Sequence, residues 1–196
     1  MRPKTKSVLT LALVLLCAVA WVGPAVAQKE EKPEATGTWD DAVALFEQGL
    51  AAQQAARYVE AIGLYEKALV IFRVLNERRA EAASLNNLGI CYRNLGDYRR
   101  AIELHEEALE IRQAIGDRRG EAASLNNLGL CYESLGDYRR AIEFYEQALP
   151  IFVDIGDRSG EATSLMNLGN CYFSLGDYRW AIEFYERSLA IFVDIK

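Results

Sequence analysis

The sequence repeats itself every forty residues over most of its length. Residues 82–121 and 122–161 are identical at 29 of 40 positions, and residues 122–156 match 162–196 at 26 of 35. A degraded earlier copy covers 42–81, which keeps Gly49 and Tyr65 but has Ala52 where the later copies have tyrosine. A fixed period of this length is typical of a solenoid, in which one unit is copied and stacked. An atypical terminal copy is what a capping repeat requires.

The apolar pattern inside one unit is helical. In 118–135, Leu125, Leu128 and Tyr132 recur at spacings of three and four residues, which predicts one helix. Gly136 ends it and Asp137 caps the next, so the unit is predicted to be two helices of about 18 residues joined by two-residue turns. The second helix carries its apolar stripe at Tyr138, Ala141, Ile142, Tyr145, Leu149 and Phe152.

One residue conflicts with this pattern. Pro150 lies inside the second predicted helix of its unit, at the position that Glu110 and Ala190 take in other copies. An interior proline removes a backbone hydrogen bond and clashes with the preceding turn. We therefore expect a local kink, or a helix that tightens after Leu149.

The spacing of the small and large apolar residues resembles the tetratricopeptide repeat (TPR) signature. The matching positions in one copy are Leu125, Leu128, Gly129, Tyr132, Ala141, Tyr145 and Ala148. The forty-residue period resembles the long-helix variety of this family, found in kinesin light chains, in spindle-orientation adaptors and in bacterial arrays that precede a caspase-like CHAT domain. The resemblance implies an all-α, right-handed αα-solenoid of about four helix pairs, over 39–81, 82–121, 122–161 and 162–196. It also implies a partner protein or peptide in the concave groove, and no catalytic residue.

The groove should be lined by the side of each first helix that faces away from the apolar stripe. Asparagine recurs there as a ladder, Asn87, Asn127 and Asn167, and an amide can pair with both the N–H and the C=O of an extended peptide. Two alternatives remain open: these amides bond to the neighbouring helix, or they recur only because the repeats were copied. The candidate peptide-binding residues are Asn86, Asn87, Arg93, Asn126, Asn127, Glu133, Asn167, Asn170 and Phe173.

Some groove positions differ between copies that are otherwise nearly identical. One position is Arg93, Glu133 and Phe173 in successive repeats, and another is Ile90, Leu130 and Asn170. Copying alone would have kept these residues the same. We expect the varied positions to set the specificity for the partner.

Composition argues against several other functions. The formal net charge is −6, and the first 27 residues contain basic groups but no acid, so the remainder is more acidic still. This balance is unsuited to a nucleic-acid backbone. With four cysteines and one histidine, we expect no metal site, no cofactor and no enzymatic activity. Cys91, Cys131 and Cys171 lie too far apart on stacked helices for disulfides, and His105 takes a core tyrosine position.

The N-terminus reads as a targeting signal. Residues 1–27 combine a basic start, an apolar stretch and the Ala25-Val26-Ala27 cleavage pattern of a secretory signal peptide. The alternatives are an uncleaved anchor, for which the apolar run is short, and lipidation at Cys17, which lacks a small preceding residue. Residues 28–38 form a polar linker. The sequence thus predicts a protein exported to the periplasm or the medium, with no membrane attachment after cleavage.

The last predicted helix leaves apolar residues without a covering helix. Leu189 and Phe192 occupy positions that the next repeat would bury. Either the sequence is the front part of a longer protein, whose effector domain could be a CHAT peptidase, or this helix is an interface for self-association or a partner.

Overall fold

The computed structural model describes residues 37–195, which lie within one compact unit, Ala35–Lys196. The predicted signal peptide and most of the predicted linker lie outside the described residues. Between residues 37 and 195 the chain forms eight α-helices and no strand, as the all-α prediction requires. The helices are α1 (Trp39–Gln54), α2 (Tyr58–Val74), α3 (Arg78–Asn94), α4 (Tyr98–Ala114), α5 (Arg118–Ser134), α6 (Tyr138–Asp154), α7 (Arg158–Ser174) and α8 (Tyr178–Asp194).

Four of the turns between helices, after α3, α4, α5 and α6, share one local device, a left-handed glycine followed by a capping aspartate. Gly136 has φ 78°, a left-handed conformation that glycine adopts without a Cβ clash, and Asp137 accepts a hydrogen bond from the Arg140 N–H at the start of α6. The links are three residues rather than two, because the leucine or isoleucine before the glycine also leaves the helix. In the first repeat Ala56 and Asn76 take this position, with φ 56° and 58°.

The first helix begins with a capping box formed by Thr38 and Asp41. The Asp41 N–H donates to the Thr38 hydroxyl, and the Thr38 N–H donates to the Asp41 carboxylate. This reciprocal pair satisfies backbone donors that the helix itself leaves unpaired. It fixes the start of the solenoid at Trp39.

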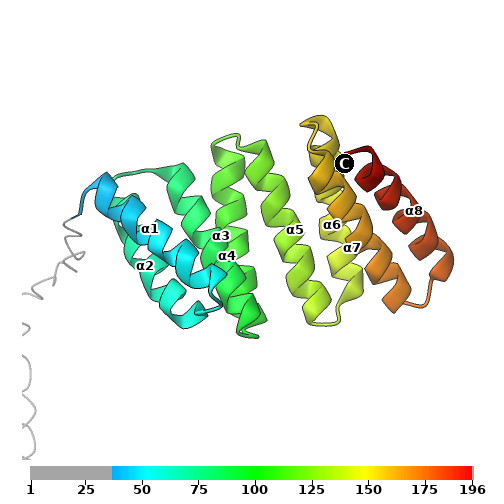
Figure 1. Cartoon of the computed structure of the whole chain (residues 1–196), viewed down its shortest axis with the longest axis horizontal. Coiled ribbons are helices and arrows are strands. Elements are labelled where there is room, and N and C mark those ends of the chain that lie inside the picture. Colours follow the sequence, from blue (N-terminus) through cyan, green and yellow to red (C-terminus); the bar gives the residue numbers. More distant parts are fainter. Residues whose placement is uncertain (1–36, 196) are drawn as a thin grey trace, which may run out of the picture. The chain divides into compact units, whose positions relative to one another are not determined.

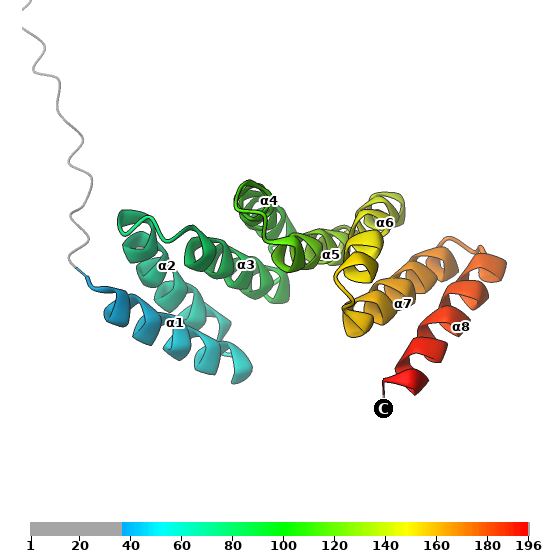
Figure 2. The same cartoon turned by 90° about the horizontal axis from the view of Figure 1, so that it is seen from above.

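The helices stack in chain order, each against the next (Figure 1). The odd-numbered helices α3, α5 and α7 also contact one another. Figure 2 shows α3 and α5 on one side of the row and α4 and α6 on the other, with the row curving toward the side of α3 and α5. We call the surface formed by the odd-numbered helices the inner face, and that of the even-numbered helices the outer face.

The core depends on close approach between the two helices of a repeat. Gly129 of α5 lies against the Tyr145 ring of α6, where an added Cβ would come within 2.4 Å of Cε1. Cys91, Cys131 and Cys171 are fully buried and unpaired, as predicted. Burial raises the pKa of the Cys91 thiol to about 11, so these cysteines act as small apolar residues.

Helix α6 continues through Pro150 to Asp154 as regular α-helix. The expected tightening after Leu149 is therefore wrong. The Pro150 side chain is exposed, and its missing N–H removes one backbone hydrogen bond from the helix.

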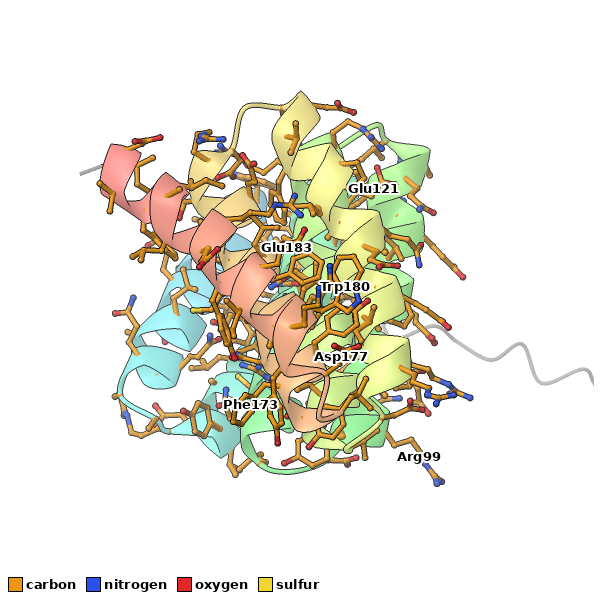
Figure 3. All side chains as sticks on the ribbon, turned by 90° about the vertical axis from the view of Figure 1, so that its right-hand side faces the viewer. Arg99, Glu121, Phe173, Asp177, Trp180 and Glu183 are labelled. Carbon is orange, nitrogen blue, oxygen red and sulfur yellow. The ribbon has the colours of Figure 1, made fainter. Side chains whose placement is uncertain are left out.

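Helix α8 exposes a stripe that its counterpart α6 buries. Ile182 is 57% exposed, whereas Ile142 at the same position of α6 is 9% exposed because α7 covers it. Leu189 is 63% exposed, and Tyr178 lies in the same row. Figure 3, which faces α8, shows Trp180 and Glu183 along this helix and Phe173 near its first turn. The α8 stripe, Tyr178, Ile182, Tyr185, Leu189 and Phe192, is the apolar surface that the sequence predicts to be open.

Candidate functional site

The inner face carries a row of amide side chains that join one odd-numbered helix to the next. Asn127 Nδ2 of α5 donates to Asn86 Oδ1 of α3 at 2.9 Å, and Asn167 Nδ2 of α7 donates to Asn126 Oδ1 of α5 at 3.4 Å. Asn127 and Asn167 therefore bond to the neighbouring helix, which is one of the alternatives that the sequence left open. These bonds fix the spacing between repeats along the face.

The interhelical bonds leave the amides with spare hydrogen-bonding groups. An asparagine has two N–H donors and a carbonyl with two lone pairs, and Asn127 uses only one of its N–H groups in the bond to Asn86. Asn87 is half-buried and makes no side-chain hydrogen bond within residues 37–195. The residue of α1 at the position equivalent to the acceptor Asn86 is Phe46, which has no polar side-chain atom for Asn87 to bond.

A polar pocket of about 330 Å³ lies on the inner face where α5, α7 and the start of α6 meet. It brings together three of the residues predicted from sequence, Glu133, Asn167 and Asn170. The remaining lining residues are Leu130, Ser134, Tyr138 and Ser174. We call this the α5–α7 pocket.

Buried tyrosines hold the polar side chains of the inner face from below. Tyr145 Oη of α6 donates to Glu133 Oε2 at 2.8 Å, and Tyr65 Oη of α2 donates to Gln53 Oε1 at 2.9 Å. Gln53 and Glu133 occupy the same position two repeats apart. Burial, followed by the neighbouring Glu133 charge, raises the pKa of Tyr145 well above its ordinary value, so the phenol remains a donor. The tyrosine therefore orients the Glu133 carboxylate.

The second repeat lacks this support. His105 takes the tyrosine position, is fully buried, and has no hydrogen-bond partner at either ring nitrogen. Burial, with Arg93 and Arg112 nearby, lowers its pKa to about 3, so the ring is neutral. Arg93, the residue above it, is half-buried and forms neither an ion pair nor a side-chain hydrogen bond with any residue between 37 and 195.

The fourth repeat presents an aromatic group at the corresponding position. Phe173 is 57% exposed and contacts Tyr178 edge to face, with ring centroids 5.4 Å apart. Tyr185 of α8 donates instead to Asn170 Oδ1 at 2.9 Å. The hydrogen bond from Tyr185 thus fixes the orientation of the Asn170 amide, which lines the α5–α7 pocket.

Sequence reasoning missed one residue of this site and underrated others. Tyr138 was assigned to the apolar stripe of its helix, yet it lines the α5–α7 pocket. Its place as the first residue of α6, directly after the Gly136 turn, is the signal that puts it at the edge of the core. Ser134 and Ser174 also lie at helix ends facing the pocket.

Two further pockets lie away from these polar groups. An apolar pocket of about 360 Å³ lies between α1 and α3, lined mainly by Trp39, Val43, Phe46 and Phe72. A smaller one of about 220 Å³ lies among α2, α3 and α4. In the part of the chain described by the structure there is no cluster of side chains suited to a metal ion, and no helix there is long and apolar enough to cross a membrane.

Known families and structures give one consistent match. The tetratricopeptide repeat model matches residues 40–114, 81–154 and 121–192. No curated protein matches the chain.

Among solved structures, BtubC (BKLC) from P. vanneervenii is similar at 26% identity and a TM-score of 0.72, over 79% of this chain and 64% of that one. The apo form of RapI is 22% identical with a TM-score of 0.75, over 81% and 58%. A Rap protein complexed with competence and sporulation factor is 22% identical with a TM-score of 0.72, over 78% and 43%. This chain therefore matches between 43% and 64% of the length of these structures.

Proposed function

Because the chain belongs to the tetratricopeptide repeat family, we propose that it is a protein-interaction scaffold whose inner face binds an extended segment of a partner protein. The α5–α7 pocket, with the adjoining amide row, is the observation that carries this proposal. The amide row runs along the face, and Asn87 and Asn127 retain unused donors, which suits the repeating polar groups of a peptide backbone. A Rap protein of similar fold has been solved in complex with competence and sporulation factor, and this supports a binding role for the present chain.

The proposal treats the chain as a scaffold rather than an enzyme. Its only described histidine is buried and neutral, and Cys91, Cys131 and Cys171 have raised pKa values, about 12 for Cys171. Acid–base and nucleophilic catalysis require accessible groups with suitable pKa values. The acidic side chains of the even-numbered helices, such as Glu143 and Glu146, lie exposed on the outer face.

A matched pair of variants tests whether the inner face binds the partner. Ser134 lines the α5–α7 pocket and bonds only to the Leu130 carbonyl of its own helix, so Ser134→Trp fills the pocket without disturbing the core. Gln147 on α6 is equally exposed and bonds only to the Glu143 carbonyl, so Gln147→Trp is the control on the outer face.

The measurement is affinity capture from the exported protein fraction with each form of the chain as bait. We expect a partner retained by the unmodified chain and by Gln147→Trp to be lost by Ser134→Trp. A partner retained by Ser134→Trp and lost by Gln147→Trp would place recognition on the outer face and overturn the proposal. Circular dichroism establishes that all three forms are equally helical.

We further propose that binding takes place after export, on the strength of the signal-peptide pattern in residues 1–27. N-terminal sequencing of the protein recovered from the exported fraction tests this, with Gln28 as the expected first residue. The alternative, that these repeats are the partner-binding front of a longer protein with a CHAT-type effector domain, predicts coding sequence for such a domain beyond Lys196.

We also propose that the chain self-associates through the α8 stripe. The exposed Ile182 and Leu189 lie where α6 contacts α7 in the preceding repeat, so this surface already has the shape of a helix-packing face. A second copy of the chain carries the same stripe, so two copies that bury their stripes against each other would form a two-fold dimer.

A further inference from the structure

We propose that the inner face selects a partner segment carrying a basic and an acidic side chain about three residues apart, the basic one bound at Glu133 and the acidic one at Arg93. This inference rests on the proposed function, because it specifies the chemistry of the segment that the inner face binds. It follows from one position that is repeated every forty residues and carries a different chemical group each time.

The repeated position holds Gln53, Arg93, Glu133 and Phe173. Gln53 and Glu133 both accept a hydrogen bond from the tyrosine beneath them, which places the two side chains in the same way on the inner face. The position has the same place in each helix pair, whereas the exposed group changes from an amide to a cation, an anion and an aromatic ring. An extended partner that follows the face meets these groups in sequence.

Glu133 provides the site for a basic group. Its carboxylate is half-buried, oriented by Tyr145, and forms no ion pair with any residue between 37 and 195. The other polar groups of the α5–α7 pocket are amides and hydroxyls, so the pocket holds one negative charge and no cation. A half-buried carboxylate is stabilised by a nearby positive charge, and the pocket is open to receive a lysine or arginine side chain.

Arg93 provides the site for an acidic group. A tyrosine at position 105 would offer an oxygen to Arg93, but the shorter histidine offers none, and both of its nitrogens remain unpaired. Arg93 is therefore a half-buried cation without an anionic partner in residues 37–195, including Glu133. A planar guanidinium binds a carboxylate through two parallel hydrogen bonds, which makes an aspartate or glutamate its best partner.

The distance between the two sites follows from the stacking of the helices. Because α3 and α5 are in contact, their axes lie about 8–10 Å apart. An extended chain advances about 3.3 Å per residue, so equivalent positions on the two helices correspond to about three residues of peptide. The geometry leaves the direction of the peptide along the face free.

The test is selection from a phage-displayed library of random peptides on the purified chain. We expect the recovered peptides to share a basic and an acidic residue about three positions apart. The variant Glu133→Gln keeps an acceptor for Tyr145, as Gln53 does for Tyr65, and removes only the charge. Glu133→Gln should abolish the preference for the basic residue and lower the affinity for a consensus peptide at least tenfold, as measured by fluorescence anisotropy. Arg93→Gln should abolish the preference for the acidic residue.

The matched control is Glu143→Gln, which removes an exposed charge from the outer face and should leave affinity unchanged. Peptides that lack the charge pair, or that bind Glu133→Gln as tightly as the unmodified chain, would overturn this inference. If Ser134→Trp also abolishes their recovery, the proposed function stands and only the charge pattern fails. Recovery that is unaffected by Ser134→Trp, or no recovery at all, would overturn the binding role of the inner face itself.

Discussion

At the scale of single residues, the most unusual group is His105. It occupies a position that tyrosine fills in the other three repeats, and its ring contacts Gly89 of α3 in the same way that Tyr145 contacts Gly129. Tyrosine spans the core and reaches a polar side chain on the inner face, whereas histidine ends inside the core with both nitrogens unpaired. Arg93 and Arg112 lie close enough to disfavour its protonation further.

His105 should make the stability of the fold depend on pH. Its pKa is lowered to about 3 in the folded state and is about 6.5 in an unfolded chain, so between these values only the unfolded state binds the proton. Its contribution is complete above pH 6.5, and stability falls as the pH drops through that window. From pH 7.5 to pH 5 we expect a loss of about 2 kcal/mol that His105→Tyr removes. Urea denaturation of both forms at the two pH values measures this, and an equal loss in both forms would contradict it.

At the scale of helices, the sequence was sufficient to predict the helix pairs but not the side-chain contacts between helices of neighbouring repeats. Periodicity and the forty-residue repeat predicted the four helix pairs of residues 37–195, and glycine and aspartate marked the turns from Gly96 onward, since these signals act within a few residues. The bond from Asn127 to Asn86 joins residues 41 apart, and no local signal says which of two adjacent amides a neighbouring helix will reach. The α5–α7 pocket depends in the same way on how three helices meet.

The contact between Gly129 and Tyr145 gives a sharp prediction for one helix pair. Gly129→Ala places a methyl group within 2.4 Å of a ring that is fully buried, and such overpacking costs about 1–3 kcal/mol. The matched control is Gly63→Ala in α2, where an added Cβ meets nothing within 4 Å. We expect the control to stabilise the fold by about 0.5–1 kcal/mol, as removal of a helical glycine does. Chemical denaturation of both variants decides; a stable Gly129→Ala protein would mean that the helices separate at little cost.

At the scale of the whole molecule, the proposed self-association through the α8 stripe predicts how the measured mass depends on protein concentration. We expect the mass measured by light scattering to rise with protein concentration, because exposed Ile182 and Leu189 are apolar and lie in one row. The double variant Ile182→Lys and Leu189→Lys should keep the monomer mass at every concentration. Val59→Lys, which replaces a residue of α2 that is 74% exposed, is the control and should still associate. A constant monomer mass for the unmodified chain would contradict self-association.

The near-identity of the contacts between repeats has a consequence for how the gene can change. The serines at 84, 124 and 164 and the cysteines at 91, 131 and 171 are all fully buried, so each of the last three repeats offers its neighbours almost the same surface. A duplicated or deleted unit of forty residues would thus find compatible neighbours on both sides. Recombination between these copies can lengthen or shorten the array with few changes of contact, and it would carry along the divergent residues at 53, 93, 133 and 173, which we propose determine what each unit recognises.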